Sequence, residues 1–254
     1  LIQRNLQLIW NDKLLLASLA LQSPFMVLVV KLTADPNCFT SNLVNIGSRT
    51  ALFILAAMAT FMGTLNSYRE ICKEREIILR EASVGVSLQA VVLSKAAVLL
   101  LVEIAQAAIL ALGFVSIVHV PQNHLLLETD MEIFVTLLLT MFSSSCVGLL
   151  ISALFTNGES AILAVLVLMI GQVVFSNVMF TVTGAAATIS NIIVCRWGMG
   201  ALGASTDLNS RMAWLQAGLD GPMYDATVEN LTHSWQMLGL ISVVLSLIHI
   251  SEPT

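Results

Sequence analysis

Charged residues are scarce in this chain of 254 residues. Asp, Glu, Lys and Arg make up 11% of it, whereas soluble domains contain roughly 25%. Hydrophobic residues make up 57%, and the mean hydropathy is +0.89. These values exclude an ordinary soluble domain and predict an integral membrane protein in a lipid bilayer. The net charge of −5 comes without a basic patch, so no nucleic acid partner is expected.

Cysteines and catalytic motifs are also sparse. The four cysteines are scattered, with no C-x-x-C pair, and are interpreted as small apolar residues. No Gly-Lys dipeptide occurs, so the chain lacks a phosphate-binding loop, and it contains neither H-E-x-x-H nor G-x-S-x-G. We therefore expect no enzyme active site, no metal site and no cofactor bound by this chain.

Long apolar runs predict the membrane spans. Five runs are expected to cross the membrane as helices, and a sixth begins near Trp235. The five runs are residues 14–32, 50–65, 88–118, 133–155 and 160–182. The predicted fold class is all-α: a polytopic membrane protein with six transmembrane helices, of which the sixth is truncated.

Both ends of the sequence indicate a fragment. The chain opens on Leu1 rather than Met and shows no signal peptide, so we expect it to begin inside a longer protein. Residues 245–254, LSLIHISEPT, match the in-frame translation of a transposon-based sequencing adapter. We expect these residues to be an artefact, with the natural chain leaving the sequence near Val244.

Charge is concentrated in residues 67–85, SYREICKEREIILREASVG, between the second and third spans. Glu76 and Arg80 stand four residues apart, in the order that favours an ion pair on a helix. Three isoleucines add apolar contact points, namely Ile71, Ile77 and Ile78. We interpret this stretch as a helix outside the bilayer that docks a soluble partner. A connector that merely rigidifies two spans is the alternative.

The distribution of cations predicts the orientation. Cations precede the first span and follow the second, at Arg4, Lys13, Arg69, Lys73, Arg75 and Arg80. The positive-inside rule therefore places both termini and residues 67–85 in the cytoplasm.

Residues 183–232 are less apolar and rich in glycine. They are predicted to form short helices and loops outside the membrane or dipping into its surface.

Polar side chains inside the predicted spans are candidates for function. Glu103 is the most unusual, because a carboxyl group deep in the bilayer is costly; Gln106, one turn on, is a possible neighbour. Lys95 lies about two turns into its span and is expected to extend toward the headgroups. Glu103 is interpreted either as a functional site or as a structural hydrogen bond to another span. Other candidates to line a path are Ser143, Ser144, Ser145, Gln172 and Asn177.

Two segments carry a family resemblance: residues 69–107, REICKEREIILREASVGVSLQAVVLSKAAVLLLVEIAQA, and residues 175–209, FSNVMFTVTGAAATISNIIVCRWGMGALGASTDLN. They resemble the membrane domain of type-2 ABC exporters, the group that includes the G-subfamily. In that family an interfacial connecting helix precedes six spans, and a cytoplasmic coupling helix contacts the ATPase domain. The resemblance implies a transmembrane domain over residues 1–244. Within it, residues 1–13 would be the connecting helix, 67–85 the coupling helix and 183–232 an external segment.

The resemblance also implies partners and roles. Residues that would couple to the ATPase domain are Glu70, Glu74, Arg75, Glu76, Arg80 and Glu81. A homodimer of membrane domains would surround a central path, driven by two ATPase domains, fused upstream or separate, that bind ATP and magnesium. We therefore expect the permease part of an ATP-driven exporter in a bacterial inner membrane. The alternative is a secondary transporter or channel that uses Glu103.

Overall fold

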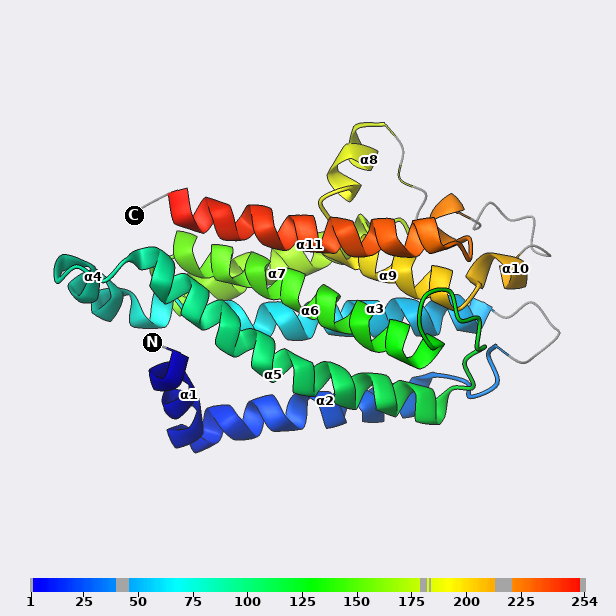
Figure 1. The fold of residues 1–254 in the computed structure, drawn as a ribbon, viewed down its shortest axis with the longest axis horizontal. Coiled ribbons are helices and arrows are strands. Elements are labelled where there is room, and N and C mark those ends of the chain that lie inside the picture. Colours follow the sequence, from blue (N-terminus) through cyan, green and yellow to red (C-terminus); the bar gives the residue numbers. More distant parts are fainter. Residues whose placement is uncertain (1, 40–45, 179–181, 183, 213–220, 252–254) are drawn as a thin grey trace.

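The computed structural model describes residues 2–39, 46–178, 182, 184–212 and 221–251 (Figure 1). Regular structure in these residues is helical throughout, which confirms the predicted all-α polytopic fold. Six helices lie side by side along one axis and form a bundle (Figure 1). They are α2 (Lys13–Thr33), α3 (Ile46–Ser67), α5 (Leu88–Ile117), α6 (Thr129–Leu154), α7 (Gly158–Val174) and α11 (Val228–Ser251).

Helix lengths agree with most of the predicted spans. Among the residues described, four stretches are long and apolar enough to cross a membrane: α2, Gly47–Ser83 with α3 inside it, α5 and α6. Helix α7 is apolar but has 17 residues, so it ends at Val174 rather than near residue 182. Helix α11 continues to Ser251, into the segment expected to be an artefact, whose origin stays a prediction.

Helices α3 and α6 pack closely against each other because glycines lie at their contact. Gly63 on α3 faces the backbone carbonyl of Met141, and Gly148 on α6 faces Thr64 and Ser67. A Cβ atom at either glycine would collide with the other helix, so larger residues would push the two helices apart. This pair forms the centre of the largest buried apolar cluster.

Helix α9 (Val194–Ser205) is the longest of the short helices that the structure describes in residues 183–232. It is packed against α3, α6 and α11, and Arg196 is its only residue that is not buried. Its small residues make this possible, since Gly198 faces Thr140 and Gly203 faces Tyr224. The short elements α8 (Ala185–Ser190), α10 (Leu208–Met212) and η3 (Pro222–Tyr224) accompany it. Helix α9 is thus packed into the bundle. Whether residues 183–232 lie outside the membrane or dip into its surface stays a prediction.

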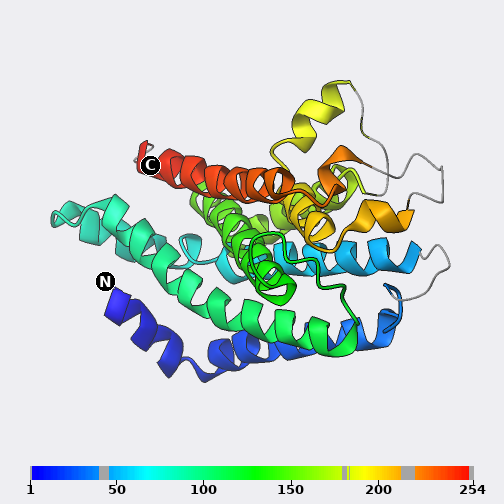
Figure 2. The same cartoon turned by 45° about the vertical axis from the view of Figure 1, so that its right-hand side comes forward.

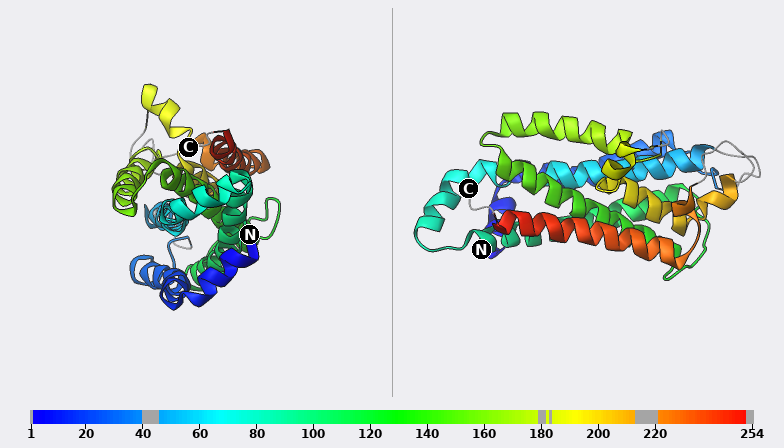
Figure 3. Two further views of the ribbon diagram at one scale, coloured as in Figure 1. Left: turned by 90° about the vertical axis from the view of Figure 1, so that its left-hand side faces the viewer. Right: turned by 90° about the horizontal axis from the view of Figure 1, so that it is seen from above.

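One end of the bundle carries the charged elements, and we call it the charged end. Helix α1 (Ile2–Asn11), the 3-10 helix η1 (Cys72–Glu74) and α4 (Arg75–Ser83) lie there, and α4 projects beyond the neighbouring helices (Figure 3). Helix α1 packs against α5 (Figure 2). The last turns of α11 reach the same end, as the predicted topology requires, whereas α10 lies at the opposite end (Figure 1).

Candidate functional site

The predicted coupling helix at residues 67–85 is shorter and more bent than expected. After α3 ends at Ser67 the chain turns, forms η1 and then the nine residues of α4. Gly85 follows with a φ of +97°, a left-handed conformation that glycine adopts without a steric penalty. Helix α5 then begins after Ser87, whose Oγ accepts a hydrogen bond from the amide of Ala90 (3.3 Å). Together these turns fold the stretch back toward α5.

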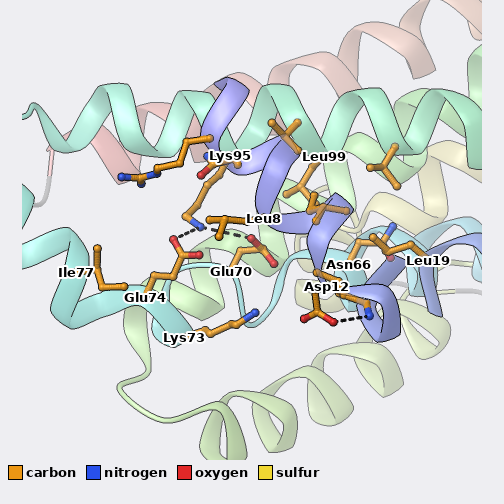
Figure 4. A pocket seen from close by; sticks show the side chains of 16 residues that line it. Leu8, Asp12, Leu19, Asn66, Glu70, Lys73, Glu74, Ile77, Lys95 and Leu99 are labelled. Carbon is orange, nitrogen blue, oxygen red and sulfur yellow. Dashed lines mark hydrogen bonds and ion pairs between the residues drawn. The ribbon is translucent and has the colours of Figure 1, made fainter. Parts of the chain in front are cut away.

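Lys95 on α5 binds this stretch. Its Nζ lies 2.8 Å from Glu74 Oε2 and 3.4 Å from Glu70 Oε2 (Figure 4). The Lys95 side chain is only 2% exposed, so the expectation that it extends to the headgroups was wrong. The physical reason is that the folded-back stretch brings two carboxylates within reach of the ammonium group. A buried cation is stable only with such partners.

A second ion pair joins α4 to α1. Arg4 Nη1 donates to Glu81 Oε1, and this carboxylate raises the pKa of Arg4 above its ordinary value. On the next residue of α1, Asn5 Nδ2 donates to Ser94 Oγ on α5 (3.2 Å). The predicted connecting helix is therefore bound to both α4 and α5.

Ser152 near the end of α6 is a third connection. Its buried Oγ accepts hydrogen bonds from the amides of Ile71 (2.9 Å) and Cys72 (3.0 Å). These amides precede α4 and would otherwise lack acceptors in a buried environment. Sequence reasoning missed Ser152, since serines in membrane spans are common and most bond within their own helix.

The three isoleucines of the stretch do not share one role. Ile71 and Ile78 are buried in an apolar cluster with residues of α5 and with Leu149 on α6. The interpretation that all three are docking contacts was therefore wrong for these two, because α5 and α6 already cover them. Ile77 is 52% exposed and lines a cavity beside α1 and α5.

The six predicted coupling residues divide into two groups. Glu70, Glu74 and Glu81 are the three acids already engaged in ion pairs within the chain. Glu76 and Arg80 are exposed, and Arg75 is partly exposed. The predicted pair between Glu76 and Arg80 was wrong, because neither side chain forms an ion pair with a described residue. Both are exposed, where an ion pair adds little stability. We call Glu76, Leu79 and Arg80, all exposed, the outer face of α4. Ile77 is also exposed but lines a cavity beside α1 and α5.

Glu103 lies in the bundle and has no exposed surface. The hydroxyl of Ser145 on α6 donates to its Oε1 and also lies 2.7 Å from the carbonyl of Gly63 on α3. Gln106 is not its neighbour: its amide binds Asn66 (2.7 Å), the carbonyl of Leu19 (3.0 Å) and Gln22 (3.2 Å). This geometry favours the structural interpretation of Glu103, while a transport role stays a prediction.

The other polar candidates connect elements of the same bundle. Ser143 Oγ donates to the carbonyl of Leu238 on α11 (2.8 Å) and lies 3.0 Å from Ser242 Oγ. Ser144 Oγ is buried without a hydrogen-bond partner among the residues described.

Two further candidates bind backbone amides. Gln172 Oε1 accepts from the amide of Cys195 (3.1 Å), and Asn177 Oδ1 accepts from that of Val182 (2.8 Å). Whether any of these residues lines a path stays a prediction. In the described part of the chain, no group of three or more His, Cys, Asp or Glu residues could hold a metal ion.

Comparisons with known proteins agree with this arrangement. The family model described as ABC-2 type transporter matches residues 1–202. An ABC transporter ATP-binding/permease protein of Mycobacterium tuberculosis is 32% identical over 161 residues. That match covers 62% of this chain but 19% of the relative, so the aligned region is about a fifth of the relative's length. The resemblance to the membrane domain of type-2 ABC transporters is thereby confirmed: the chain belongs to the ABC-2 type transporter family.

Proposed function

We propose that this chain is the permease part of an ATP-driven exporter and that the outer face of α4 receives the motion of an ATPase domain. Family membership supports the transport role. The observation that carries the coupling role is the division of residues 70–81: three of the acids are bound inside the chain, while the outer face projects free. A surface that the chain does not use itself is available to a partner.

The contacts behind α4 support the transmission of force. Lys95 connects the stretch to α5, Ser152 connects it to α6, and Arg4 connects it to α1. A push on the outer face would therefore move these helices together, as a rigid body rather than as a loose loop. Closure of two ATPase domains on ATP and magnesium would supply the push.

The remaining parts of the proposal follow from the family. Two membrane domains would form a homodimer around the path, with termini and α4 in the cytoplasm of a bacterium and the spans in its inner membrane. The name of the mycobacterial relative combines ATP binding with a permease, which supports an ATPase domain on the same or an associated chain. A gradient-driven transporter based on Glu103 is less well supported, because the carboxyl group bonds to a neighbouring helix.

Cross-linking tests the docking surface. In the intact transporter, this chain together with its ATPase domain, Leu79→Cys on α4 should cross-link to the ATPase domain through a short reagent that joins the cysteine thiol to a lysine amine of that domain. Leu163→Cys on α7 is the matched control, since Leu163 is also an exposed leucine, on a span. Equal cross-linking of both cysteines, or of neither, would contradict the docking surface.

ATP hydrolysis tests the coupling itself. In proteoliposomes, the combined variant Glu76→Lys and Arg80→Glu reverses both charges of the outer face. We expect the ATP hydrolysis rate of the intact transporter to change several-fold, because the docked surface no longer matches its partner. Unchanged hydrolysis, with the cross-link retained, would contradict coupling through these residues.

A further inference from the structure

A cavity of about 470 Å³ lies between α1, the start of α2, α5 and the stretch around η1 (Figure 4). Pockets for small organic ligands have volumes of roughly 300–1,000 Å³, so one ligand group of moderate size fits. The ion pairs of Lys95 lie in its wall, but the cavity continues past them toward α2.

One half of the cavity is apolar and follows the spans. Its lining here includes Leu8 on α1 and, on the spans, Leu15, Leu19, Val98, Leu99 and Val102. Val102 lies about two turns beyond Lys95 on α5, roughly 10 Å deeper along the helix. The cavity therefore runs from the level of the charged end into the apolar part of the bundle, along the direction of a lipid chain.

The other half is charged but neutral in sum. Its three cations, Arg4, Lys73 and Lys95, stand against three carboxylates, Asp12, Glu70 and Glu74. A wall of balanced charge suits a ligand that carries both signs better than a strongly anionic one.

Some of these polar groups are free to bind. Of the three cations, Lys73 alone has no ion pair to a described residue. Asp12 caps α2 through Oδ1, which accepts from the amide of Leu15 (3.1 Å), and is otherwise exposed. Asn5 is 7% exposed, and its Oδ1 accepts no hydrogen bond from the described residues. One cationic donor, on Lys73, and acceptors on Asp12 and Asn5 are thus available in the lining of the cavity.

We propose that this cavity binds a phospholipid with a zwitterionic, primary-amine headgroup from the adjacent leaflet. Lys73 binds the phosphate, and the carboxylates of Asp12 and Glu70 accept hydrogen bonds from the ammonium group. The first carbons of one acyl chain lie along Leu15 and Leu19. Bound in this way, the lipid joins α1 to the stretch that carries α4, beyond the transport and coupling roles proposed above.

A phosphatidylcholine is a less suitable occupant, because its trimethylated nitrogen offers no N–H donor to the carboxylates. A phosphatidylglycerol carries a net negative charge, for which a wall with three cations and three carboxylates has no excess of cations, and its headgroup has no ammonium group for the carboxylates. The expected order of affinity is therefore phosphatidylethanolamine first, with the other two clearly weaker.

Native mass spectrometry of the intact transporter measures this binding without nucleotide, so its outcome does not depend on ATP coupling. Delipidated protein in detergent is titrated with dioleoyl phosphatidylethanolamine, phosphatidylcholine or phosphatidylglycerol. Lys73→Ala should weaken phosphatidylethanolamine binding about tenfold, since one charge-assisted contact is lost. Lys31→Ala, another exposed lysine near the far end of α2, should leave it unchanged.

A second variant tests the apolar half. Leu15→Trp fills the cavity and should reduce binding at least tenfold, whereas Leu163→Trp on α7 should not. Equal affinity for the three lipids, or equal effects of Lys73→Ala and Lys31→Ala, would show unspecific lipid contact and overturn the proposal. Absence of a bound lipid together with protection of Lys73 from an amine reagent would also overturn it, in favour of a segment of the ATPase domain in the cavity.

Discussion

The inner and outer sides of residues 70–81 have similar composition but opposite roles. On the inner side, Glu70 and Glu74 bind Lys95, while Ile78 is buried against α5. On the outer face, Glu76 and Arg80 are exposed and bind no described residue, and Leu79 is also exposed. Charged and aliphatic residues thus hold the stretch in place on one side and stay exposed on the other.

The difference comes from what lies opposite each side. A buried ammonium group needs counter-ions, and the fold supplies two carboxylates within 3.4 Å of Lys95 Nζ. Among the described residues, none forms an ion pair with the charges of the outer side, which are exposed, and an ion pair at an exposed site adds little. Changes on the inner side should therefore lower stability, and changes on the outer face should alter only the interaction with a partner.

Lys95→Met should have the largest effect. It leaves two neighbouring carboxylates without their cation, and breaking a buried ion pair by removing one partner costs about 3 kcal/mol. We expect that loss in the free energy of unfolding of the membrane domain, measured by denaturant titration of the intact transporter in detergent.

The triple variant Lys95→Met, Glu70→Gln, Glu74→Gln is the matched control. Neutral amides beside methionine carry no unpaired charge, so most of the stability should return. If Lys95→Met alone were as stable as the natural chain, the inner side would not be a structural contact.

Ser152→Ala should have the next largest effect. Two buried amides, of Ile71 and Cys72, lose their acceptor, and an unsatisfied buried group costs about 1–3 kcal/mol. Hydrogen exchange of these two amides should accelerate about tenfold or more, because the free energy of local opening of the stretch is lower. Ser116→Ala, an exposed serine of α5 that bonds within its own helix, should leave their exchange unchanged. Equal exchange in both variants would show that Ser152 does not hold the stretch.

Much of the bundle could be predicted from the positions and lengths of the apolar runs. Spans α2, α5 and α6 are apolar over nearly their whole length, and the charge of residues 67–85 marks a segment outside the bilayer. The partner of Lys95 could not be predicted from the sequence. A lysine at this position in a span can be stabilised either by lipid headgroups or by carboxylates of the protein. Only the turn that folds the stretch against α5 decides between them.

The burial of helix α9 could not be predicted for a related reason. Its burial rests on close approach rather than on large apolar side chains, so the segment has the composition of a loop. The spacing of Gly198, Gly200 and Gly203 was the available signal, since glycines at such intervals allow helices to approach closely. The charge of residues 67–85 was predicted. Which of these residues form the outer face could not be predicted, because that depends on which of them α5 and α6 cover.

The ion pair between Arg4 and Glu81 should contribute less than the inner contacts. Their side chains are 40% and 23% exposed, so solvent screens the attraction, and a coupling of about 0.5 kcal/mol is expected. A double-mutant cycle with Arg4→Gln and Glu81→Gln measures it, and the value should fall further at high salt. A coupling as large as the effect of Lys95→Met would mean that α1 belongs to the inner structure rather than to its edge.

Glu76→Ala combined with Arg80→Ala should have the smallest effect on stability, with no measurable change in the free energy of unfolding. Both side chains are exposed and make no ion pair with the residues described, so their removal exposes no buried group. The same double variant should show an altered rate of ATP hydrolysis in proteoliposomes. A changed rate at unchanged stability separates a docking role from a structural one. The comparison is Glu70→Ala with Glu74→Ala, which removes two charges from the inner side and should lower stability. If the outer-face variant lost stability to the same extent, the two sides would not differ in role, and the docking surface would have to lie elsewhere on the charged end.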